Sequence, residues 1–137
     1  MVRKIAWQFN CKNTHKSWEK ILEAALAKMD ASYLKALQKD TDWLPGPTQI
    51  FNAFSLPKKQ VKFVLLGESP YPRPESANGY AFWDASVTDV WSKTGLSKPV
   101  NRATSLRNFI KMLLLTDGLL QKEDLGQPAI SQIDKSS

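Results

Sequence analysis

The stretch VKFVLLGESPYPRPESANGYAFWD, residues 61–84, carries most of the information about the fold. Its first six residues, Val61–Leu66, are apolar or β-branched apart from one lysine, and Gly67 follows them. A short apolar run of this kind is typical of a buried strand in a parallel sheet. Residues 67–74 contain three prolines and predict an ordered loop. Because ligands of open α/β sheets bind at the carboxyl ends of strands, this loop is the place to expect a binding site.

Helical patterns precede this stretch. Apolar residues at helical spacing run from Trp18 to Met29, and Ser17 is the predicted N-cap. Asp30 is placed to cap a second helix, which a Pro-Gly-Pro turn brings to an end. A short helical segment is expected to begin at Thr48.

After the stretch, residues 85–104 look irregular, and a clear amphipathic helix follows. It begins at a Thr104 or Ser105 cap and stops at Gly118. Residues 119–137 read as a polar tail with no packing motif.

These patterns predict a single α/β domain over residues 1–137. Residues 1–60 are expected to be mainly helical, and 61–118 to hold the central strand, the pocket loop and the following helix. One strand has no partner to pair with. Either strands near 79–83 escape detection, or more sheet belongs after Ser137.

Composition excludes several classes of protein. Hydrophobic residues make up 42% of the 137 residues and charged residues 23%, which is ordinary for a folded protein. No apolar run is long enough to cross a bilayer, and the N-terminus lacks the apolar region of a secretory signal, so we expect a cytoplasmic protein without membrane contact. A single cysteine, Cys11, excludes an intrachain disulfide and a cysteine-cluster metal site. We expect no metal and no cofactor.

The formal net charge is +6, and it is unevenly distributed. Residues 1–66 contain eleven Lys or Arg against five Asp or Glu, whereas residues 67–137 contain eight of each. Such an excess favours attraction to a polyanion, nucleic acid above all. A solvated lysine-rich surface explains the charge equally well.

The stretch resembles the uracil-DNA glycosylase superfamily. The common form of that family has an apolar strand, then Gly-Gln-Asp-Pro-Tyr-His, a Gly/Pro segment, and His-Gly-Leu-Ala-Phe. The matching residues here are GESPYP at 67–72 and NGYAF at 78–82, and 50–54 and 105–108 also look like the family. The resemblance covers about Trp18 to Leu115. It implies a three-layer α/β/α Rossmann-like fold, incomplete in this chain.

The resemblance also implies roles for individual residues. Phe82 would stack on a uracil flipped out of DNA, and Tyr71 would crowd the 5-position so that thymine is refused. The backbone amide of Glu68 would hold a uracil carbonyl oxygen. The first residue of each motif completes the base-binding set, and the DNA backbone would meet the start of a helix. These remaining positions are Gly67 and Asn78 for the base, and Thr104 and Ser105 for the phosphates.

Each role has a simpler alternative. Glu68 also fits a solvent-facing loop residue, and Tyr71 and Phe82 fit core aromatics. Asn78 fits a turn residue and Arg73 a surface cation. Two further sets are weaker still: Cys11 with His15 as half of a metal site, and three tryptophans as base-stacking rings, of which Trp18 fits the core better than DNA. The other two tryptophans are Trp7 and Trp43.

The chain departs from the family in its catalytic groups. Ser69 replaces the water-activating aspartate and has no charge to stabilise a sugar cation, which excludes a direct copy of that mechanism. Some branches with iron–sulfur clusters carry Gly-Glu-Ala-Pro-Gly, which is closer at 67–70, but one cysteine cannot hold a cluster. The family's catalytic histidine lies beyond the helix that ends at Gly118, and His15 does not match it. The chain therefore looks like the N-terminal part of a longer glycosylase-like protein, with Glu68 as the candidate catalytic carboxylate.

Three functions follow from these features. The first is a monomeric DNA-repair protein that, when complete, hydrolyses the N-glycosidic bond of a flipped-out uracil or related damaged base, with this chain inactive alone. The second is a non-catalytic nucleic-acid-binding or damage-recognition protein on the same scaffold, which Ser69 favours. The third is a small α/β protein-interaction domain whose resemblance is incidental.

Overall fold

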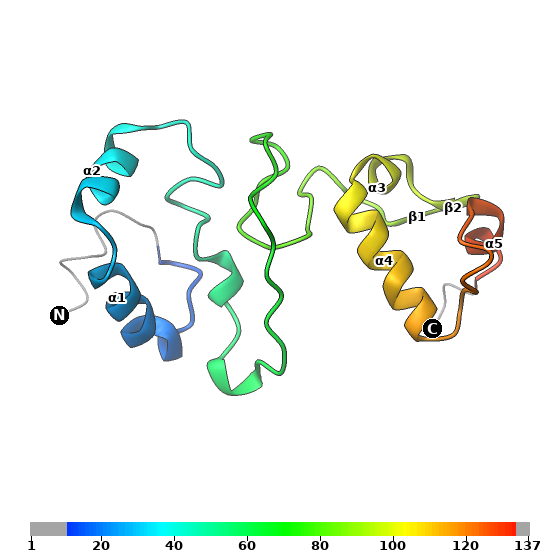
Figure 1. The fold of residues 1–137 in the computed structure, drawn as a ribbon, viewed down its shortest axis with the longest axis horizontal. Coiled ribbons are helices and arrows are strands. Elements are labelled where there is room, and N and C mark those ends of the chain that lie inside the picture. Colours follow the sequence, from blue (N-terminus) through cyan, green and yellow to red (C-terminus); the bar gives the residue numbers. More distant parts are fainter. Residues whose placement is uncertain (1–10, 134–137) are drawn as a thin grey trace. The chain divides into compact units, whose positions relative to one another are not determined.

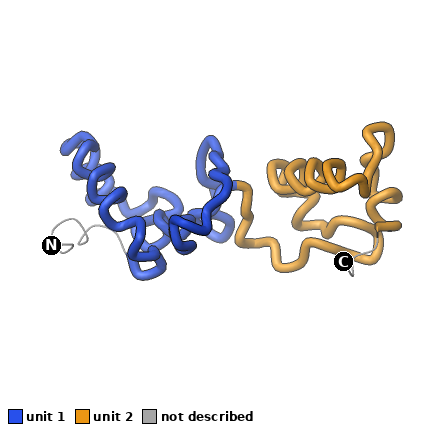
Figure 2. Tube along the Cα trace, turned by 90° about the horizontal axis from the view of Figure 1, so that it is seen from below, with its two compact units in different colours: residues 1–81 blue, residues 82–137 orange. Residues whose placement is uncertain are grey.

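A computed structural model of the chain describes residues 11–133. Its contacts group into two compact units, residues 1–81 and residues 82–137, which Figure 2 colours separately. This boundary falls inside the segment 61–118, and the single domain over 1–137 stays a prediction. Trp7 and the N-terminal residues that argue against a secretory signal lie outside the described residues. No helix in the described part is long and apolar enough to cross a membrane.

The first unit is built from short helices (Figure 1). Asp30 caps the second of its two α-helices as predicted, because its Oδ1 accepts the N–H of Tyr33 at 2.9 Å. The hydroxyl of Ser32 donates to the same oxygen, and these hydrogen bonds, that of Ser32 first, lower the pKa of Asp30. The elements are η2 (Lys16–Trp18), α1 (Glu19–Ala27), α2 (Ala31–Lys39), η3 (Asn52–Phe54) and η4 (Lys58–Gln60).

The prediction that Ser17 caps the first α-helix is wrong. Ser17 lies inside η2, and His15 is the N-cap there, with its Nδ1 accepting the N–H of Ser17 at 3.2 Å. The Ser17 Oγ instead accepts the N–H of Lys58 at 2.9 Å. A partner distant in sequence has thus replaced the local one, and α1 begins at Glu19 and ends at Ala27 rather than near Met29.

A small aromatic cluster forms the core of this unit. Leu22 and Phe51 are buried, and Trp18 packs edge-on against Phe54 with ring centroids 5.2 Å apart. Trp18 Nε1 also donates to a backbone carbonyl at 2.7 Å, and so does Trp43 Nε1 at 2.8 Å. Both tryptophans therefore serve the core, as the apolar helix stripe predicted for Trp18 alone.

The predicted central strand at Val61–Leu66 does not form. No strand in the described part of the chain pairs with it, and Phe63 and Leu66 remain 90% and 83% exposed. The prediction was wrong because apolar sequence alone does not make a strand: backbone N–H and C=O groups need a neighbouring strand. The region of 79–83 forms turns and bends and supplies no such neighbour.

The second unit corrects the expectation that residues 85–104 are irregular. They contain a short antiparallel hairpin, in which Trp91 pairs with Leu96, and a helix. The polar segment after 118 also holds a helix, although it was expected to lack any packing motif. The elements are β1 (Trp91–Ser92), β2 (Gly95–Leu96), α3 (Lys98–Arg102), α4 (Thr104–Thr116) and α5 (Gln127–Ser131).

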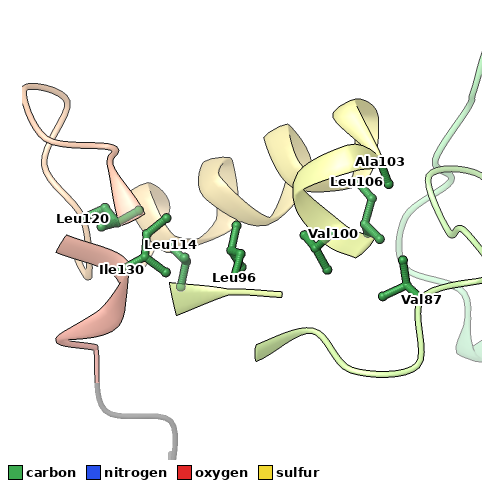
Figure 3. Close-up of a cluster of buried hydrophobic side chains, with 8 residues drawn as sticks. All are labelled: Val87, Leu96, Val100, Ala103, Leu106, Leu114, Leu120 and Ile130. Carbon is green, nitrogen blue, oxygen red and sulfur yellow. The ribbon is translucent and has the colours of Figure 1, made fainter. Parts of the chain in front are cut away.

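Ile130 explains why α5 packs. Its side chain is fully buried and joins Leu96 and Val100 in one apolar cluster, shown in Figure 3. The cluster takes residues from the hairpin and from all three helices of the unit. Its buried members are Val87, Leu96, Val100, Ala103, Leu106, Leu114, Leu120 and Ile130.

A polar side chain fastens α5 to the hairpin. Gln127 Oε1 accepts the N–H of Leu96 at 3.0 Å, and Gln127 Nε2 donates to the carbonyl of Leu96 at 3.0 Å. A Cβ at Gly95 would lie only 2.5 Å from Gln127 Oε1, so glycine allows this approach. The Gln127 amide thus pairs with β2 as a neighbouring strand would.

Neither Thr104 nor Ser105 is the N-cap of α4. The helix begins at Thr104, and the cap is the buried Ala103, which has no side-chain hydrogen bond to offer. The other end is as predicted, because Gly118 follows the helix with φ +73°.

Replacing Gln127 by alanine should destabilise the second unit. The part-buried N–H of Leu96 would lose its bond to Gln127, and the Leu96 carbonyl would lose one donor while keeping Asn101 Nδ2 at 3.0 Å. We expect a loss of about 1–3 kcal/mol in the free energy of unfolding. Urea denaturation of the 137-residue chain measures it. The matched control is Gln132→Ala at the exposed end of α5, expected within about 0.5 kcal/mol of wild type. Equal losses in the two variants would contradict this role.

Candidate functional site

The two sequence motifs meet in the first unit. A Cβ added to Gly67 would lie 3.4 Å from the Cβ of Ala81, so the start of the first motif lies against the end of the second. A glycine at this point leaves room for the approach. Residues separated by a proline-rich loop are therefore neighbours in space.

The second motif is held in a defined turn. Gly79 has φ +84°, and a Cβ there would lie 2.0 Å from the carbonyl oxygen of Gln49. Asn52 Nδ2 donates to the carbonyl oxygen of Asn78 at 2.9 Å. Asn78 Oδ1 accepts the N–H of Tyr80 at 3.0 Å. The segment around η3 thus fixes the backbone of the turn from outside, and the Asn78 side chain fixes it from inside.

Gly79→Ala should be strongly destabilising. A methyl group would be forced onto the Gln49 carbonyl, in addition to the cost of the left-handed backbone, and we expect about 2–5 kcal/mol in the free energy of unfolding. Gly118→Ala is the matched control: its φ is +73° but no atom lies within 4 Å of the added group. It should cost only about 1–2 kcal/mol. Equal costs in urea denaturation would show that the Gln49 contact does not constrain the turn.

The predicted catalytic positions of the first motif face solvent. Glu68 and Ser69 are exposed, as is Gly67, whereas Tyr71 is half-buried. Arg73 Nε lies 3.9 Å from Glu75 Oε1, and both side chains are more than half exposed. This exposed ion pair fits the interpretation of Arg73 as a surface cation.

Phe82 opens the second unit in a strained conformation. Its φ is +61°, in the left-handed region that bulky residues rarely occupy. Its half-buried ring stacks on Phe109 of α4, with centroids 5.6 Å apart and planes inclined by 22°. Strain of this kind concentrates at functional positions. Phe109 escaped notice in the sequence because it fits the apolar stripe of its helix.

Asp84 stabilises the turn that follows Phe82. Its carboxylate is buried, and Oδ1 accepts the N–H of Ser86 at 2.9 Å and the hydroxyl of Ser86 at 2.6 Å. Asp84 was not among the residues predicted for the site. The signal was present, because an aspartate two residues before a serine is a common turn pattern.

Thr104 and Ser105 are exposed on the first turn of α4. Backbone N–H groups at that end of a helix have no intrahelical partner and attract anions. Nearby, Arg107 Nη1 donates to the carbonyl of Asn101 at 2.9 Å and so ties α4 to α3. Of the predicted residues, Gly67, Glu68, Ser69, Tyr71 and Asn78 belong to the first unit, and Phe82, Thr104 and Ser105 to the second.

The described residues offer no candidate metal centre. Within 11–133, no three His, Cys, Asp or Glu side chains are grouped closely enough to hold an ion. Burial, and then the charge of Glu19, raise the pKa of Cys11. The thiol is therefore held in its protonated form, which is a poor ligand. His15 Nδ1 is already engaged with Ser17.

Comparison with known proteins identifies the family. No family model matches the chain. The uracil-DNA glycosylase of Wolinella succinogenes is 32% identical over 127 residues, which are 88% of this chain and 46% of that protein. The wild-type UNG crystal structure from Nitratifractor salsuginis matches with a TM-score of 0.85 and 42% identity, over 98% of this chain and 55% of that one. The chain belongs to the uracil-DNA glycosylase superfamily.

The extent of these matches bears on the fold. This glycosylase-like chain spans about half the length of the relatives it matches, and the match to the uracil-DNA glycosylase of Corynebacterium efficiens, 38% identical over 71 residues, covers 30% of that protein. The predicted fold class, an incomplete α/β fold of the uracil-DNA glycosylase type, is confirmed. What the chain shows of it is a mixture of helices and one small sheet.

Proposed function

We propose that the protein is a uracil-DNA glycosylase-like DNA-repair protein. It binds DNA and, together with the part of the fold that its relatives have beyond the matched half, hydrolyses the N-glycosidic bond of a flipped-out uracil or related damaged base. The observation that carries this proposal is the meeting of GESPY and NGYA through Gly67 and Ala81, in a chain 42% identical to a UNG protein. The 137 residues alone bind the base but do not excise it.

Aromatic residues recognise the base in this proposal. Phe82 presents one ring face to the flipped uracil while Phe109 supports the other face at 5.6 Å. The strained backbone at Phe82 is retained because it aims the ring. Tyr71 crowds the 5-position of the pyrimidine, where thymine carries a methyl group.

In this proposal, the positive charge that develops on the sugar is stabilised differently from the common form of the family. When the bond from C1′ of the sugar to the base nitrogen breaks, its electron pair leaves with uracil, and water then adds to the cationic sugar. Ser69 cannot stabilise that cation. We assign this role to the Glu68 carboxylate, which is exposed beside it, and the Glu68 backbone N–H donates to a uracil carbonyl oxygen. The reaction consumes only water, so no metal or cofactor is required.

The DNA backbone meets the positive parts of the chain. Thr104 and Ser105 receive a phosphate at the N-terminus of α4, and the lysine excess of residues 1–66 attracts the polyanion. One copy of the chain contains both motifs, and we therefore propose a monomer. We also propose that it acts in the cytoplasm.

A second candidate function is non-catalytic recognition of damaged DNA. Ser69 favours it, because loss of the usual carboxylate removes charge needed for bond cleavage but no group needed for binding. The two candidates differ in a single observable, which is whether bound uracil is released.

The deciding experiment uses the protein as its own cells make it, with its intact mass recorded. Purified protein is mixed at saturating concentration with a single-stranded oligonucleotide that carries one uracil. We expect release of free uracil. Tight binding without release of uracil would favour the second candidate, non-catalytic recognition of damaged DNA. Absence of both binding and release would contradict both candidate functions.

Substitution of the two rings should separate stacking from base discrimination. Phe82→Ala is expected to lower the rate of uracil release about 5- to 150-fold, the equivalent of 1–3 kcal/mol of stacking. Tyr71→Ala should lower it less and allow slow release of thymine. The control is Tyr33→Ala on the exposed face of α2, expected to match wild type. Unchanged rate and selectivity in both ring variants would refute the assignment of the base-binding residues.

A further inference from the structure

Asn78 occupies a place from which it can contact the base. It lies within the second motif, three residues before Ala81, which packs against the Gly67 position. Its side chain is half-buried and its backbone is held by Asn52. The position is therefore both ordered and next to the meeting point of the motifs.

The turn decides which end of the Asn78 amide is available. A backbone N–H can only donate, so the side-chain atom that faces the N–H of Tyr80 at 3.0 Å must be the amide oxygen. The oxygen is thereby committed to the turn. The other end of the amide, the NH₂ group, is a donor only.

Asn52 holds Asn78 in this pose. Its Nδ2 donates to the Asn78 carbonyl at 2.9 Å, and its own Oδ1 accepts from Asn13 Nδ2 at 3.1 Å. The Asn52 Cβ also lies 3.3 Å from where a Cβ of Gly79 would be. Asn52 therefore holds the Asn78 backbone, and the N–H of Tyr80 holds the Asn78 side-chain amide.

We infer that Asn78 donates a hydrogen bond from its NH₂ group to a carbonyl oxygen of the flipped base, and that Asn52 is the positioning residue that holds the Asn78 backbone in place. The inference rests on the proposed function. Uracil has two carbonyl oxygens, and negative charge spreads onto them when the base leaves as an anion. A fixed donor stabilises that charge, whereas an acceptor at the same place repels it.

Asn78→Asp separates this role from a structural one. The aspartate keeps an oxygen for the N–H of Tyr80 and keeps the turn, but it replaces the NH₂ donor by a second oxygen. At pH 7 the variant should release uracil about 10- to 100-fold more slowly than wild type. Its melting temperature should be unchanged, because aspartate serves such turns as well as asparagine.

The pH profile supplies a second readout. A protonated carboxyl group is again a donor, and an aspartic acid with an ordinary pKa near 4 gains protonated fraction about tenfold per pH unit between pH 7 and pH 5. The ratio of the variant rate to the wild-type rate should rise in parallel. Residues 49–55, which pack against the turn, contain no titratable side chain. The neighbouring Glu68, Arg73, Glu75 and Tyr80 are present in both proteins, so the ratio isolates the substituted side chain.

Two further variants complete the experiment. Asn52→Ala should lower the rate by a few-fold with a ratio that does not change with pH, because the donor remains but is less well positioned. Gln38→Ala, an amide residue on the exposed face of α2, should match wild type. If Asn78→Asp fails to fold, the Asn52→Ala result decides: a wild-type rate would overturn the positioning role and with it the inference.

The same experiment distinguishes failure of the inference about Asn78 from failure of the proposed function. Release of uracil by the wild-type protein tests the function, and the ratios test the inference. If wild type releases no uracil, the ratios are measured on equilibrium binding of the uracil oligonucleotide against a thymine control. An Asn78→Asp protein that is folded and within twofold of wild type at pH 7, or a ratio that is flat between pH 7 and pH 5, would overturn the inference.

Discussion

The close contact between Gly79 and the carbonyl oxygen of Gln49 is the constraint on which the candidate site depends. It admits no side chain at position 79, and it lays the second motif along the segment that begins η3. From that contact follow the Asn52 bond to the carbonyl of Asn78 and the turn bond from Tyr80 to the Asn78 oxygen. A close backbone approach, rather than the apolar core, thus fixes the turn that carries Asn78.

In the second unit, packing holds an aromatic residue in an unfavourable backbone conformation. Phe82 has φ +61°, its ring stacks on Phe109 of α4, and the turn that Asp84 makes with Ser86 follows it in the chain. α4 is itself packed through a buried cluster that Ile130 completes, and Gln127 fastens the helix that carries Ile130. Gln127 therefore supports the Phe82 ring indirectly. It fastens α5, α5 packs with α4 in the buried cluster, and α4 carries Phe109, on which Phe82 stacks.

Local signals in the sequence predicted part of this arrangement correctly. Asp30 caps its helix and Gly118 ends another, because each depends only on neighbouring backbone atoms. Predictions failed where a distant partner decides. Ser17 accepts from Lys58 instead of capping a helix, and Gln127 pairs with a strand 31 residues away. Val61–Leu66 was predicted as a strand from its apolar composition, but pairing is a property of two segments and the described residues supply only one. For the site, the motifs indicated which residues to consider, whereas the donor polarity of Asn78 and the support from Phe109 became visible only in the structure.

The central claim is the proposal that the base binds where GESPY and NGYA meet in the first unit, and it can be tested directly by nuclear magnetic resonance. The ¹⁵N-labelled 137-residue chain is titrated with a single-stranded oligonucleotide containing one uracil, and then with the same oligonucleotide containing thymine. The account predicts shifts of the backbone amides of residues 67–69, 71 and 78–81 that are larger with uracil. Equal shifts with both oligonucleotides, or uracil-dependent shifts confined to other residues, would contradict it.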